Sequence, residues 1–70
     1  MTEMVEIEVI VKKFSPYSDA VFVEHPNNNF HLPHSQIKDF DEVEMELASQ
    51  SEDPIILEIP RWLAAKENLI

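Results

Sequence analysis

Glutamates that alternate with apolar residues are the feature of this sequence with the clearest chemistry. In a strand, alternate residues share one face about 6.6 Å apart, which approximates the spacing of successive phosphates along a nucleic-acid strand. We therefore predict a face that binds basic residues of a partner protein and acts as a DNA mimic. The predicted contact residues are Glu6, Glu8, Glu42, Glu44 and Glu46. The alternative is a solvated strand face that hinders edge-to-edge aggregation.

Three histidines, His25, His31 and His34, lie within ten residues of one another, and imidazole is a common zinc ligand. The chain contains no cysteine, so Asp19 or Glu24 would have to complete a tetrahedral set. We expect surface histidines, no bound metal and no other cofactor.

Catalytic patterns are hard to find in this chain. Ser35 follows His34, but a catalytic pair needs adjacency in space and an orienting acid. A phosphate-binding loop rich in glycine is excluded, because the chain has no glycine. Paired carboxylates for glycoside hydrolysis would need a cleft to raise one pKa, and so short a chain has little room for one. We therefore predict that the protein is not an enzyme.

Composition limits the class of protein and of partner. The chain has 70 residues, 44% of them hydrophobic, with 14 acidic against 5 basic side chains and a net charge of −9. This predicts one globular domain, residues 1–70, that repels nucleic acid and attracts basic protein surfaces. The lack of cysteine suits a reducing compartment, and neither a membrane span nor a signal pattern is present. We expect a cytoplasmic protein without membrane contact.

Period-2 patterns and turn residues predict the elements that position the carboxylates. We expect five strands, each bounded by proline, asparagine, serine or aspartate; they cover residues 5–11, 20–24, 30–32, 42–47 and 55–59. Residues 27–29, all asparagine, are expected to form a hairpin turn with positive φ. The predicted fold is α+β, mainly β: a five-stranded antiparallel sheet or small partly open barrel with one C-terminal helix.

The C-terminal segment has the signals of a helix. Pro60 suits its first position, Asn68 suits a left-handed C-cap, and residues 61–67 lie between them. Trp62 is expected to pack under this helix beside Leu63 and Leu69.

Two segments, residues 30–37 and 59–70, resemble small proteins of bacteriophages and prophages that have no settled function. In that family the first motif is aromatic-x-Pro-x-Ser-Gln-Ile and the second is Pro-x-Trp-Leu-Ala-x-Lys-x-Gly-Leu. This chain has His31 in place of the aromatic residue, His34 in place of a basic residue and Asn68 in place of the glycine. The resemblance implies a phage origin and a structural role for both motifs.

These observations lead to two function hypotheses. The first is a non-enzymatic phage protein that binds a basic site on a host nucleic-acid-handling complex, of the anti-CRISPR or anti-restriction type, and inhibits it. The alternative is a small barrel that serves phage replication or recombination, either as a homo-oligomer or by stacking nucleic-acid bases on Tyr17, Phe22 or Phe30.

Overall fold

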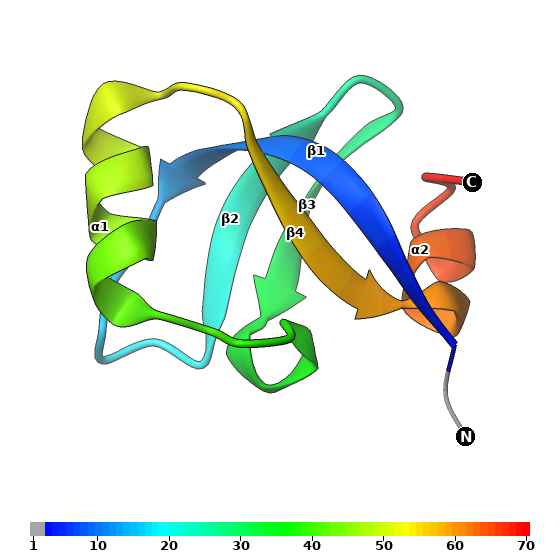
Figure 1. Ribbon diagram of the computed structural model, residues 1–70. Coiled ribbons are helices and arrows are strands. Elements are labelled where there is room, and N and C mark those ends of the chain that lie inside the picture. Colours follow the sequence, from blue (N-terminus) through cyan, green and yellow to red (C-terminus); the bar gives the residue numbers. More distant parts are fainter. Residues whose placement is uncertain (1–2) are drawn as a thin grey trace.

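The computed structural model describes residues 3–70, which form a curved sheet with a helix near each of its ends (Figure 1). Along the chain the elements are β1 (Met4–Lys13), β2 (Ala20–His25), β3 (Asn28–Pro33), the 3₁₀ turn η1 (His34–Gln36), α1 (Glu42–Ser51), β4 (Ile55–Pro60) and α2 (Arg61–Lys66). The strand order is β3-β2-β1-β4, and all pairings are antiparallel. The sheet is therefore open and four-stranded, with β3 and β4 at its edges.

Strand β1 is the longest strand and serves two partners. Its first part, Met4–Val9, pairs with β4, and its last part, from Ile10 on, pairs with β2. The register with β2 shifts between Val11 and Lys13, which marks a bulge. The bend of β1 in Figure 1 lets one strand belong to both parts of the sheet.

The prediction of a strand over residues 42–47 is wrong, because this segment belongs to α1. The Asp41 side chain caps the helix by accepting hydrogen bonds from the backbone N–H groups of Val43 (2.9 Å) and Glu44 (3.4 Å). Carboxylates in the first turn favour the helix N-terminus electrostatically. Glutamate, methionine, leucine and alanine are also strong helix formers, and only Val43 is β-branched. Local propensity and the cap therefore prevail over the period-2 pattern.

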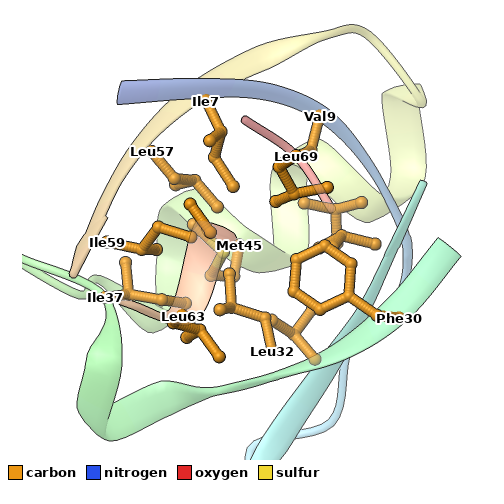
Figure 2. Close-up of a cluster of buried hydrophobic side chains, with 14 of the residues drawn as sticks. Ile7, Val9, Phe30, Leu32, Ile37, Met45, Leu57, Ile59, Leu63 and Leu69 are labelled. Atoms are coloured by element: carbon orange, nitrogen blue, oxygen red, sulfur yellow. The ribbon is translucent and has the colours of Figure 1, made fainter. Parts of the chain in front are cut away.

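The other predicted strands are confirmed, and their alternation places one face of each strand in a single core (Figure 2). The core residues from strands are Ile7, Val9, Val11, Val21, Val23, Phe30, Leu32, Leu57 and Ile59. Helices and turns close this core from the sides with Ile37, Met45, Ala48, Leu63, Ala64 and Leu69. Each large side chain buried in this way stabilises the fold by about 1.5–3 kcal/mol.

The predicted C-terminal helix is also confirmed, with bounds one residue inside those expected at each end. Asn68 has φ 61°, as predicted for its place after the helix. The N–H of Leu69 donates to the carbonyl of Ala64 (2.8 Å), and the N–H of Asn68 donates to that of Ala65 (3.1 Å). This is a Schellman motif with asparagine in the position usually held by glycine, and it turns Leu69 into the core.

The β2–β3 turn differs from the prediction. Because His25 pairs with Asn28, the turn consists of Pro26 and Asn27, and neither of them has positive φ. Asn28 lies inside β3, and its side-chain amide donates to the backbone carbonyl (3.2 Å) and the carboxylate (3.0 Å) of Glu67. The amide of Asn27 donates to the carbonyl of Asn68 (3.3 Å). The asparagines thus fasten the hairpin to the end of α2.

Both edge strands end in proline, Pro33 on β3 and Pro60 on β4. Proline has no N–H and cannot extend a ladder. The edge of β4 is further occupied where the backbone N–H of Lys38 donates to the carbonyl of Glu58 (2.9 Å). Lys38 and Pro60 therefore limit the free edge of β4.

Candidate functional site

Acidic side chains outnumber basic ones on the surface of this protein. Within residues 3–70, three of the five basic side chains form ion pairs: Lys12 with Glu52 (2.6 Å), Lys38 with Glu58 (3.5 Å) and Arg61 with Glu3 (2.9 Å). The hydrogen bond from Lys12 lowers the pKa of Glu52, and the same bond raises the pKa of Lys12. With 14 acidic side chains in the sequence, most carboxylates face solvent without a cation.

Two of the five predicted contact residues meet at the edge of β4. Glu6 of β1 and Glu44 of α1 line one hollow of about 200 Å³, together with Asp39 and Glu58. The only cation that lines this hollow, in the described part of the chain, is Lys38. Glu6 and Glu58 also lie directly opposite each other in the β1–β4 ladder, an arrangement that is destabilising for like charges. We call these four carboxylates the acidic cluster.

The other three predicted residues lie elsewhere. Glu8 lines a second hollow of about 350 Å³ between β1 and β2, where Glu24 is the other carboxylate. Glu42 and Glu46 project from α1 one turn apart. The expected row of three carboxylates on one strand face is therefore wrong, and so is the phosphate-like spacing derived from it. At 100° per residue, Glu44 lies on a different side of α1 from Glu42 and Glu46.

Helical geometry instead exposes two apolar residues of this segment, which in the expected strand would share one apolar face with Met45. Val43 and Leu47 lie one turn apart on α1 and are 66% and 60% exposed. They line a shallow groove of about 720 Å³, which we call the α1 groove; its lining residues are Asp41, Val43, Glu44, Leu47, Ala48, Gln50, Ser51, Asp53 and Ile55. A comparison with the helical period would have found this exposed pair. Met45 and Ala48 lie on the buried side of α1, and Val43 and Leu47 lie on the opposite side.

The three aromatic residues proposed as stacking platforms differ in their exposure to solvent. Phe30 is buried in the core and cannot stack on a base. Phe22 is half-buried and packs on His31 with ring centroids 4.9 Å apart, whereas Tyr17 is 97% exposed in the loop after β1. Trp62, expected to pack under α2, is instead 53% exposed, because Leu63 and Ala64 take the buried side of that short helix.

The three histidines that were considered as metal ligands each contact different residues. His25 accepts a hydrogen bond at Nδ1 from the Asn27 N–H (3.1 Å), and His31 lies against Phe22. His34 stacks on Phe40 with centroids 4.5 Å apart and also contacts Phe14, and its buried Nε2 has no hydrogen-bond partner. Residues 3–70 contain no group of three His, Asp or Glu side chains placed to hold a metal ion.

No protein-family model, curated protein or solved structure matches this chain. No helix within residues 3–70 is long and apolar enough to cross a membrane.

Proposed function

We propose that this chain is a non-enzymatic binding protein whose acidic cluster contacts a basic site on a host nucleic-acid-handling complex and inhibits that complex. The observation that carries the proposal is that the acidic cluster lines one hollow beside Lys38. Its members come from β1 (Glu6), the loop before α1 (Asp39), α1 (Glu44) and β4 (Glu58). Carboxylates that line one hollow can accept charge-assisted hydrogen bonds from arginine and lysine side chains of a partner.

The overall charge supports the same class of partner. A net charge of −9 steers the protein toward basic surfaces and away from nucleic-acid phosphates. Strongly basic surfaces are typical of proteins that handle nucleic acid, because such proteins must neutralise its phosphates. Residues 30–37 and 59–70 resemble phage proteins, and this resemblance supports a target in the host cell. CRISPR and restriction complexes are targets of this kind, and the chain would then be an anti-CRISPR or anti-restriction protein.

The proposal does not require the carboxylates to copy a phosphate backbone. A cluster at one edge of the sheet can block a basic site by occupying it, which needs charge complementarity and not a regular repeat. Glu8 can extend the contact, because it shares an outward face with Glu6 on β1. Glu42 and Glu46 lie on the solvent side of α1 and add to the field that attracts the partner.

The test is capture from bacterial lysate on immobilised protein, washed at low and at high salt, with retained proteins identified by mass spectrometry. We expect a basic nucleic-acid-binding complex that is retained at low salt and released at high salt. The complex is then purified and its affinity measured for Glu6→Lys and for Asp19→Lys, which change the net charge equally.

Glu6→Lys is expected to weaken binding about tenfold or more, equivalent to about 1.4 kcal/mol, while Asp19→Lys binds like the unmodified protein. Loss of folding would not explain this result, because Glu6→Lys replaces a like-charge pair with Glu58 by an opposite-charge pair. Retention of no such complex, or equal affinity of the two variants, would contradict the proposal.

A further inference from the structure

The α1 groove has a volume of about 720 Å³, and its centre is apolar. Val43 and Leu47 project from α1 beside Ile55 of β4, with Ala48 at the base. In a chain of this length, two aliphatic side chains on consecutive turns of one helix, both exposed by more than half, make an apolar stripe that solvent contact disfavours.

Carboxylates surround this stripe on both sides. At 100° per residue, Glu42 and Glu46 form the row on one side of Val43 and Leu47, and Glu44 lies on the other side. Asp41 and Asp53 also line the groove, and its lining contains no lysine, arginine or histidine. An occupant that matches this surface is apolar at its centre and positively charged along its margins.

Charge decides between the candidate occupants. A second copy of this chain would bring the same carboxylates against those of the first, at a net charge of −9 on each copy. Nucleic acid would be repelled by the same carboxylates. A basic segment of a partner protein satisfies both the apolar stripe and the rim.

Backbone geometry favours a helical segment over an extended one. A bound strand needs a free sheet edge for its backbone hydrogen bonds, whereas α1 satisfies its own backbone and the edge of β4 is limited by Lys38 and Pro60. An amphipathic helix satisfies its own backbone and needs only a groove. The ten residues of α1 span about 15 Å, which is enough to contact two to three turns of such a helix.

We infer that the α1 groove binds a basic amphipathic helix of the partner, with aliphatic side chains of that helix on Val43 and Leu47 and its lysine or arginine side chains on Glu42, Glu44 and Glu46. The inference rests on the proposed function, to which it adds a second contact and the structural class of the bound segment.

The probe is a labelled synthetic peptide of leucine and lysine whose leucines recur with the helical period. A second peptide of the same composition has its residues reordered so that no apolar face forms. Fluorescence anisotropy is measured for both at low and at high salt. We expect the amphipathic peptide to bind about tenfold more tightly than the reordered one, and this ratio to persist at high salt because burial of apolar surface is not screened.

The double variant Val43→Ser with Leu47→Ser is expected to abolish the difference between the two peptides. The matched control is Ile70→Ser, which also removes an exposed aliphatic side chain and lies outside the α1 groove. Circular dichroism verifies that the double variant keeps its helices. Glu46→Lys provides a second variant. It is expected to lower the affinity for the amphipathic peptide, which should still bind more tightly than the reordered one.

Equal binding of the two peptides, or an advantage that survives the double variant, would overturn the inference while leaving the acidic cluster as the binding site. Absence of binding by either peptide would also overturn it. The proposed function is decided separately, by the captured complex and the Glu6→Lys variant, so its failure and the failure of this inference are distinguishable.

Discussion

At the scale of single residues, positive φ angles occur at Asp39 (54°), Glu52 (55°) and Asn68 (61°), in a chain that has no glycine. The left-handed region costs about 1–2 kcal/mol for an ordinary residue, and asparagine and aspartate tolerate it best. Glu52 ends α1 in this conformation, and Asn68 follows α2. The C-terminal ends of both helices therefore use a residue other than glycine in the left-handed conformation.

The cap at Asn68 gives a direct test of this account. We expect Asn68→Ala to lower the free energy of unfolding by about 1 kcal/mol, because alanine bears the steric penalty without the tolerance of asparagine. Asn68→Gly is expected to be at least as stable as the unmodified protein. Urea denaturation measures both. Equal stability of the alanine and glycine variants would show that the Schellman motif is not what holds the chain end.

The pair of Lys12 and Glu52 predicts a pH dependence. The folded-state pKa of Glu52 is lowered below its ordinary value of 4.5, so its contribution to stability is present above pH 4.5 and is lost as the pH falls through the lowered pKa. Lys12 has its pKa raised above 10.5, so its contribution is present below that pH and is lost as the pH rises through the raised pKa.

We therefore compare the urea midpoints of the unmodified protein and of Glu52→Gln as the pH falls below 4.5. The difference between them is expected to be small, because both groups are exposed, and to shrink further as Glu52 becomes protonated. Added salt should reduce it in the same way. A difference that is constant with pH would mean that the carboxylate charge contributes nothing.

At the scale of elements, α1 depends on its N-cap. We expect Asp41→Ala to lower the free energy of unfolding by about 1 kcal/mol, because the N–H groups of Val43 and Glu44 lose their acceptor. Asp41→Asn is the matched control, since asparagine caps about as well and differs only in charge. Chemical denaturation followed by circular dichroism measures both. An alanine variant as stable as the asparagine variant would contradict the assigned cap.

Sequence reasoning predicted β1 because β-branched residues alternate there with polar ones, and β4 because its apolar residues recur at alternate positions; the burial of Val9 and Ile59 follows from these patterns. It placed β2 and β3 chiefly from the turn residues that flank them. It failed for α1, where the same alternation occurs in residues of high helix propensity behind an aspartate cap. The predicted strand would place Val43 and Leu47 on the same face as the buried Met45, whereas the helix exposes both.

The candidate site was predictable only in part. Glu6 and Glu44 were named as contact residues, and they do line one hollow. Asp39 and Glu58 were not named, because their proximity depends on how the loop before α1 lies along the edge of β4. Such long-range placement leaves no periodic signal in the sequence.

At the scale of the whole molecule, the excess of negative charge predicts how stability responds to salt. Fourteen acidic and five basic side chains repel one another on balance in the folded state. Sodium chloride shortens the screening length from about 10 Å at 0.1 M to about 3 Å at 1 M. We expect the free energy of unfolding to rise over this range, with a shallower rise for the double variant Glu6→Lys with Asp19→Lys. A fall in stability with salt would mean that the three ion pairs outweigh the repulsion.

The shared use of β1 by two partner strands has a consequence for the order of folding. The β2–β3 hairpin joins neighbouring residues and can form within microseconds. The β1–β4 ladder instead brings Met4 to Pro60 and must close most of the chain into a loop before its contacts stabilise it. We expect this closure to be the late, rate-limiting step. Truncation of Ile59 in β4 should then mainly accelerate unfolding, whereas truncation of Val23 in β2 should mainly slow refolding.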